Sequence, residues 1–82
     1  MNIESLKSEL LKYGVKASDP TKTGIRWDKN VYTMFVNPGM NEKRVTLAVE
    51  MSGLILDFCV WGGVNGPVQG AFNGIDALIS SL

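Results

Sequence analysis

The sequence contains no histidine and only one cysteine in 82 residues. Histidine is the side chain that most often acts as a general base and most often binds zinc, so its absence argues against several enzyme classes. A single cysteine cannot form a disulfide within the chain, and nothing therefore indicates an oxidising compartment. We expect a cytoplasmic protein with no enzyme activity, no metal and no cofactor.

Long apolar runs and net charge are also missing. No apolar stretch is long enough to span a bilayer, and residues 1–4 lack the basic and then apolar layout of a secretory signal, so we expect no membrane interaction. Eight basic and eight acidic residues cancel, which removes the overall field typical of nucleic-acid binders. The balance is uneven, because residues 12–44 hold seven basic and three acidic residues, a local charge of +4.

Residues 45–61 predict one β-hairpin around a two-residue turn at Ser52-Gly53. Side chains along a strand alternate between two faces, and counting outward from this turn places only apolar residues on one of them. Gly53 tolerates the positive φ that a tight turn requires. The inward set is Val45, Leu47, Val49, Met51, Leu54, Leu56, Phe58 and Val60. The outward set is Thr46, Ala48, Glu50, Ile55, Asp57, Cys59 and Trp61.

A second hairpin is predicted for Ile25–Asp28 and Val31–Val36, with its turn at Lys29-Asn30 because asparagine tolerates a positive φ. Residues 15–24 before it are expected to form an irregular connection. Residues 37–39 after it predict a type II turn centred on proline and glycine. The core side of this hairpin would hold Ile25, Trp27, Tyr32, Met34 and Val36. Its outer side would hold Arg26, Asp28, Val31, Thr33 and Phe35.

Helical spacing appears at both ends of the chain. Asn2 is a suitable N-cap for a helix that buries Ile3, Leu6, Leu10 and Tyr13, and Gly14 is a suitable terminator. After a break at residues 62–67, apolar residues recur with helical spacing to the end of the chain. The second helix begins either at Pro67 or, because glycines within a helix are costly, near Asn73 as its cap.

These elements predict a single α+β domain over residues 1–82. We expect a two-layer sandwich in which an N-terminal helix, a four-stranded antiparallel meander and a C-terminal helix follow in order, with both helices on one face of the sheet. The other face is more apolar than a solvated surface needs to be, which favours a protein partner or self-association. The chain would be a homodimer, or an adaptor or inhibitor of a larger protein. The expected contact residues are Phe35, Ile55, Asp57, Cys59 and Trp61.

Two other functions are compatible with the sequence. Basic and aromatic residues on the first hairpin and third strand suit single-stranded nucleic acid, whose bases stack on aromatic rings. The residues concerned are Arg26, Lys29, Phe35, Lys43 and Arg44. A weaker alternative is a phosphate ligand at the glycine-rich residues 62–74, although no P-loop pattern is present. Cys59 is expected to be inert packing, and Arg44 is expected to form a cation–π pair with Trp61.

Overall fold

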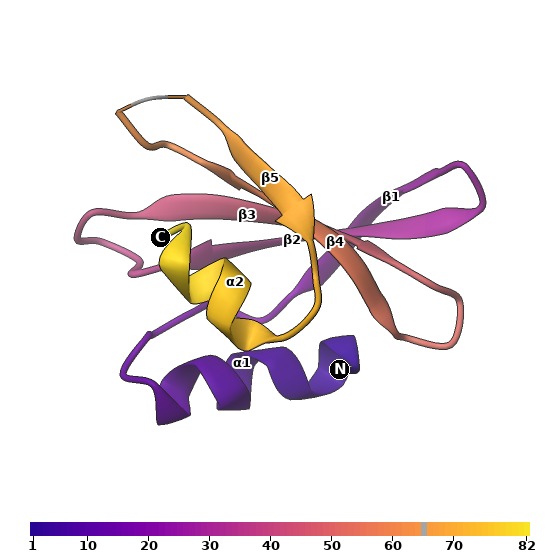
Figure 1. The fold of residues 1–82 in the computed structure, drawn as a ribbon, viewed down its shortest axis with the longest axis horizontal. Coiled ribbons are helices and arrows are strands. Elements are labelled where there is room, and N and C mark those ends of the chain that lie inside the picture. The colour runs from indigo at the N-terminus through magenta and orange to yellow at the C-terminus, as the bar shows by residue number, and fades with distance from the viewer. Residues whose placement is uncertain (65) are drawn as a thin grey trace.

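The computed structural model describes residues 1–64 and 66–82; Asn65, within the predicted break, lies outside the described residues. The elements in chain order are α1 (Ile3–Lys12), β1 (Thr21–Arg26), β2 (Lys29–Val36), β3 (Lys43–Val49), β4 (Ile55–Trp61), β5 (Val68–Ala71) and α2 (Ile75–Ser80). The strands form one antiparallel sheet in the order β1-β2-β3-β4-β5 (Figure 1). The predicted α+β class is confirmed, but the predicted number of strands is wrong because β5 is a fifth.

The first helix begins and ends as its sequence predicts. The side chain of Asn2 accepts a hydrogen bond of 3.0 Å from the Glu4 N–H, which satisfies one of the free donors of the first turn. Gly14, just after the helix, has a φ of 78°. Tyr13 is exposed at the end of the helix, so the prediction that it is buried is wrong. The buried side chains of α1 are Ile3, Leu6 and Leu10.

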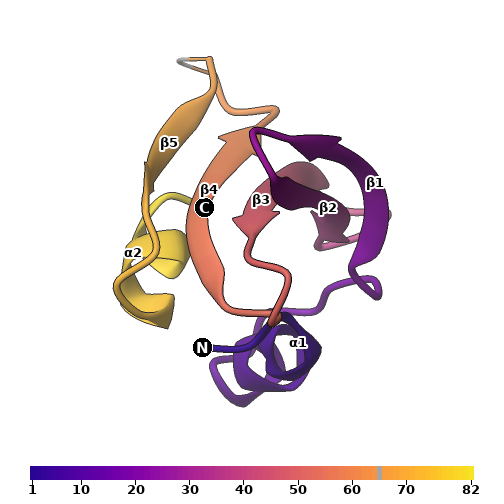
Figure 2. The ribbon, with the colours of Figure 1, turned by 90° about the vertical axis from the view of Figure 1, so that its right-hand side faces the viewer.

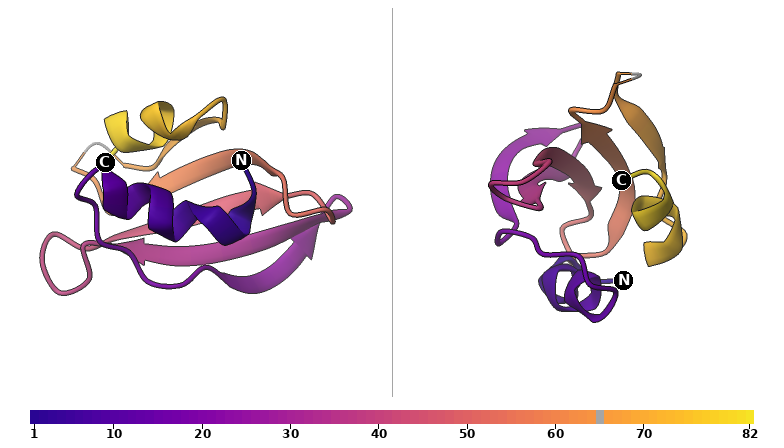
Figure 3. Two further views of the ribbon diagram at one scale, coloured as in Figure 1. Left: turned by 90° about the horizontal axis from the view of Figure 1, so that it is seen from below. Right: turned by 90° about the vertical axis from the view of Figure 1, so that its left-hand side faces the viewer.

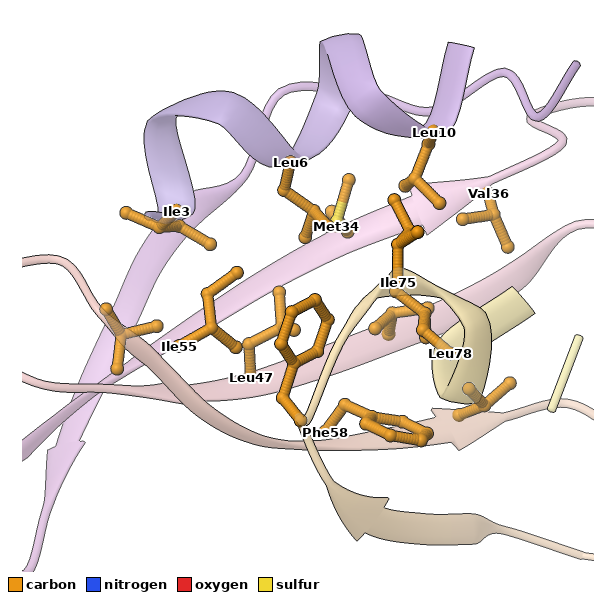
Figure 4. Close-up of a cluster of buried hydrophobic side chains, with 14 residues drawn as sticks. Ile3, Leu6, Leu10, Met34, Val36, Leu47, Ile55, Phe58, Ile75 and Leu78 are labelled. Carbon is orange, nitrogen blue, oxygen red and sulfur yellow. The ribbon is translucent and has the colours of Figure 1, made fainter. Parts of the chain in front are cut away.

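One hydrophobic core joins side chains of both helices and of the strands (Figure 4). In the close-up, Leu6 and Leu10 point from α1 toward the strands. Phe58 of β4 packs edge-on against Phe72, with ring centres 6.4 Å apart and planes at 87°. The strands contribute Met34, Val36, Val45, Leu47, Val49, Ile55, Phe58 and Val60, and α2 contributes Ile75 and Leu78.

The turn of the first hairpin lies two residues earlier than predicted. Trp27 and Asp28 occupy it with φ values of 52° and 61°, as both central residues of a type I′ turn must. Trp27 is therefore 85% exposed instead of facing the core, and Ile25 is also exposed. Asn30, predicted to lie in the turn, is buried in β2. The earlier turn lets β1 begin at Thr21, within the predicted irregular connection, and pair with β2 as far as Thr33.

The central hairpin has the predicted register over most of its length. Val45 pairs with Val60 and Leu47 with Phe58, as the alternating pattern predicts. Near the turn a β-bulge changes the pairing, and the partner of Val49 is Ile55.

The bulge corrects the predicted position of Ile55. This residue is 2% exposed and belongs to the core, so its predicted place on the outer face is wrong. The cause is a contact with α1, since the Ile55 N–H donates to the Met1 carbonyl and the Ile3 N–H donates to the Gly53 carbonyl. These bonds from the start of the chain widen the loop, and a pattern within the hairpin alone does not contain them. Met51 and Leu54, predicted to be inward, are exposed in the loop.

The glycine-rich segment continues as a strand before the last helix begins. β5 pairs with β4 such that Gly70 lies opposite Phe58, and a Cβ on Gly70 would lie 3.5 Å from the Phe58 ring. An extended segment also avoids the cost of Gly70 and Gly74 within a helix. Gly74 is the N-cap of α2, so the predicted start at Pro67 is wrong, and the predicted start near Asn73 is correct to within one residue although Asn73 is not the cap. Seen end-on, the strands follow a curve and both helices lie outside it (Figures 2 and 3).

Candidate functional site

The side chains that alternate with the core residues form three rows across the sheet. The first row is Phe35, Arg44 and Trp61. The second row is Thr33, Thr46, Cys59 and Gln69. The third row is Val31, Ala48, Asp57 and Ala71. We call the surface formed by these rows the outer face.

Much of the outer face lines a groove of about 1020 Å³. One wall of the groove is formed by Arg26, Trp27 and Lys29, at and beside the turn between β1 and β2. Residues of β5, the strand next to β4, also line the groove. The residues of the three rows that line the groove are Val31, Thr46, Ala48, Asp57, Cys59, Trp61, Gln69 and Ala71. A surface that is hollowed and built mostly from apolar and small polar side chains is suited to hold an extended segment of another molecule.

Trp61 is held in one orientation at the end of the groove. Its Nε1–H donates a 3.0 Å hydrogen bond to Thr46 Oγ1. The Arg44 guanidinium carbon lies 4.9 Å from the centre of its ring. The two contacts fix the half-buried indole against β3 while part of it remains open to the groove. A fixed aromatic side chain loses little conformational entropy when a partner packs on it.

The charges beside the groove are mostly positive. Arg26 and Lys29 line it, and Arg44 lies next to it on Trp61. Asp57 is the acidic residue among the lining residues of the described chain. Since the net charge of the whole chain is zero, this surface is more basic than the rest of the molecule.

Cys59 lies between Thr46 and Gln69 in the second row. Burial raises the pKa of its thiol; Asp57 raises that pKa further and Arg44 lowers it. The thiol is therefore protonated near neutral pH, which is the less reactive form of cysteine. That Cys59 is inert packing stays a prediction.

Leu56 and Trp27 were both predicted on the core side and line the groove instead, and Trp27 is the more unusual of the two. A bulky residue with a φ of 52° is uncommon, because a Cβ is disfavoured in the left-handed region. The structure nevertheless places this ring in the turn, 85% exposed and beside Arg26 and Lys29. Strained backbone positions cluster at functional sites, and tryptophan is enriched among the residues that dominate binding energy.

The structure brings some of the predicted contact residues together and separates others. Asp57, Cys59 and Trp61 lie in the groove, and Phe35 is on the outer face beside Arg44. Ile55 is excluded because it is in the core. Of the residues predicted for nucleic acid, Arg26 and Lys29 line the groove, whereas the Lys43 ammonium donates to the Leu82 carbonyl away from it.

The phosphate site predicted at residues 62–74 requires a glycine-rich turn that leads from a strand directly into a helix. Among the described residues, β5 separates the glycine-rich turn from α2, and α2 has only 6 residues. The geometry assumed for that site is therefore wrong.

A smaller cleft of about 590 Å³ lies between α1, Tyr32 and the loop before β4. Lys7 and Asp19 meet at its side with a distance of 2.8 Å between Nζ and Oδ1. Both side chains are largely exposed, so the pair contributes little to stability or binding. The groove of the outer face is the better candidate site.

Comparisons with protein-family models, with curated proteins and with solved structures give no match for this chain. No helix within the described residues has the length and apolar character needed to cross a bilayer. The same residues contain no group of three or more histidine, cysteine, aspartate or glutamate side chains arranged to hold a metal ion.

Proposed function

We propose that the chain is a non-enzymatic protein-binding domain of the cytoplasm that receives an extended segment of a partner in the groove of its outer face. The observation that carries the proposal is the difference between the two faces of the sheet. Leu47 and Val60 belong to the same buried core as side chains of α1 and α2, and on this basis the proposal assigns both helices to one face as in a two-layer sandwich. The alternate residues remain in an open groove with two tryptophans, Trp27 and Trp61.

The composition of the groove supports binding over catalysis. Tryptophan and arginine are the residues most enriched among those that dominate binding energy, and Trp27, Trp61 and Arg26 all line the groove. The Cys59 thiol is held in its protonated form, so it is a poor nucleophile. The proposal accordingly assigns no metal and no cofactor to the site.

The test is a selection of binders from a library of displayed random peptides, followed by titration of the recovered peptides. Trp61→Glu places a charge in the groove and should weaken binding at least about tenfold. Tyr13→Glu is the matched control, since Tyr13 is an exposed aromatic residue at the end of α1, away from the groove. Peptides that bind both variants as well as the wild type would overturn the proposal.

Single-stranded nucleic acid is a second candidate because of the row formed by Phe35, Arg44 and Trp61, which alternates aromatic and cationic side chains across three strands. Arg26 and Lys29 add positive charge nearby. Titration with an oligothymidine should then quench tryptophan fluorescence, and the affinity should fall steeply with salt. An affinity that is negligible at low salt would eliminate this candidate.

A further inference from the structure

The two edges of the sheet differ in how they are protected against pairing with another strand. β1 carries Lys22 and Arg26 and has a bulge between Lys22 and Gly24, and charges and bulges are features that block edge pairing. β5, with the sequence VQGA, has no charged residue, no proline and no bulge. β5 is therefore the edge that can accept a strand.

The pairing of β5 with β4 defines which of its backbone groups are free. The Phe72 N–H donates to the Leu56 carbonyl, and the register between the strands continues this pattern to Gly70 and Val68. The N–H and C=O groups of Gln69 and Ala71 consequently point away from β4. No hydrogen bond within the described residues takes up these four groups.

We propose that a second copy of this chain pairs with β5 through its own β5, antiparallel about a twofold axis. The axis would pass between the two Gly70 residues, so that Gln69 of each copy lies opposite Ala71 of the other. In this register every free N–H of β5 meets a free C=O of the second copy, which makes four hydrogen bonds across the axis. Other registers leave some of these groups unpaired or use Pro67, which has no N–H.

The side chains fit the same register. Val68 is 44% exposed, and it would lie directly opposite Phe72 of the second copy, so the seam between the two strands covers part of its apolar surface. The glycines at the axis have no side chains to separate the strands. Neither strand carries charge and the whole chain has a net charge of zero, so two copies do not repel each other. A small domain also gains stability when it buries an open edge.

This dimer is independent of the proposed function of the groove. A twofold axis perpendicular to the sheet joins the two sheets edge to edge and places both outer faces on the same side. Each groove remains open, because Gln69 and Ala71 contribute to it only at the β5 end. Failure of the dimer would leave the binding proposal standing, and the reverse is also true.

The experiment is sedimentation equilibrium of the wild type from about 1 to about 500 μM, with amide exchange as a second measurement. We expect twice the 8.9 kDa chain mass at the upper end, with the amides of Gln69 and Ala71 protected only there. Gln69→Pro removes a donor that faces the second copy while the β4 pairing is kept, and should raise the dissociation constant at least about tenfold. Val68→Lys places a charge opposite Phe72 and should also raise the dissociation constant at least about tenfold. It replaces Gln69→Pro as the test if the proline variant does not fold.

Ile25→Pro is the control on the opposite edge. The pair of Arg26 with Lys29 closes the turn by hydrogen bonds, so the Ile25 N–H points away from β2 just as that of Gln69 points away from β4. This variant should dimerise like the wild type. A monomer at all concentrations would overturn the proposal, as would a dimer that survives Val68→Lys or one that Ile25→Pro abolishes equally. A dimer abolished by Trp61→Glu and unaffected by Val68→Lys would place the interface on the outer face instead.

Discussion

The guanidinium group of Arg44 lies on the ring of Trp61, 4.9 Å from its centre, and the two residues are direct neighbours across β3 and β4. The pair places a positive charge of the outer face directly on the ring of Trp61. Because the Trp61 Nε1–H also donates a hydrogen bond to Thr46 Oγ1, Trp61 is held by two side chains of β3. The orientation of the Trp61 ring therefore depends on Arg44 and Thr46, neither of which is a core residue.

Replacement of Arg44 by alanine tests this pair. Loss of an exposed cation–π contact should lower the free energy of unfolding by about 0.5–1 kcal/mol, measured by urea denaturation. Arg26→Ala is the control, because Arg26 is exposed and in a strand but has no ring beneath it; it should change stability by less than about 0.5 kcal/mol. Equal effects of the two replacements would show that the Arg44–Trp61 contact contributes nothing specific.

Ile55 and Leu56 are adjacent and similar in size, and the bulge in β4 gives them opposite roles. Ile55→Ala should destabilise by about 2–5 kcal/mol because it leaves a cavity in the core. Leu56→Ala should cost only about 1 kcal/mol, since this side chain is half-buried and lines the groove. Urea denaturation of both variants measures the difference. A hairpin without the bulge would reverse the order of the two effects.

The sequence predicts well those parts of the fold that depend on local pattern. The cap at Asn2, the stop at Gly14 and the central pairing of Leu47 with Phe58 are all found. The type II turn at residues 37–39 is also confirmed, because the Met40 N–H donates to the Asn37 carbonyl and Gly39 has a φ of 84°. In each case the residue types within a few positions determine the conformation.

The errors occur where a contact from elsewhere in the chain decides between two local possibilities. Bonds from the start of α1 open the loop before β4 and turn Ile55 inward. Gly70 is extended because its backbone pairs with β4. The Phe58 ring lies where a side chain of residue 70 would begin, 3.5 Å from an added Cβ. The same distinction explains why only part of the candidate site could be predicted from the sequence. Cys59 and Trp61 follow the strand alternation, whereas the position of Trp27 depends on a turn that local preferences placed elsewhere.

The turn position of Trp27 predicts a stabilising substitution. Asparagine is favoured in type I′ turns and adopts a positive φ more readily than tryptophan, so Trp27→Asn should raise the free energy of unfolding by about 1 kcal/mol. Trp27→Ala lacks the short polar side chain by which asparagine hydrogen-bonds locally at a positive φ, and it should leave stability nearly unchanged. Thermal unfolding of the two variants distinguishes relief of strain from loss of the exposed ring. Destabilisation by both would mean that the ring packs on the groove wall and is not simply exposed.

The raised pKa of the Cys59 thiol predicts how stability depends on pH. Burial favours the neutral thiol, so the folded chain holds this proton to higher pH than the unfolded chain does. Below the pKa of an unfolded thiol, about 8.5, both states are protonated and Cys59 adds no pH dependence. Above that pH the unfolded chain loses the proton first, and stability should fall as the pH rises through the folded pKa.

Cys59→Ser is the control, because serine does not titrate in this range and the lysines and tyrosines of this variant match those of the wild type. The stability difference between the two proteins should therefore be constant near neutral pH and shift against the wild type in alkali. Urea denaturation at a series of pH values measures this difference, and a wild type that gains relative to Cys59→Ser in alkali would show that Arg44, and not burial, dominates the environment of the thiol.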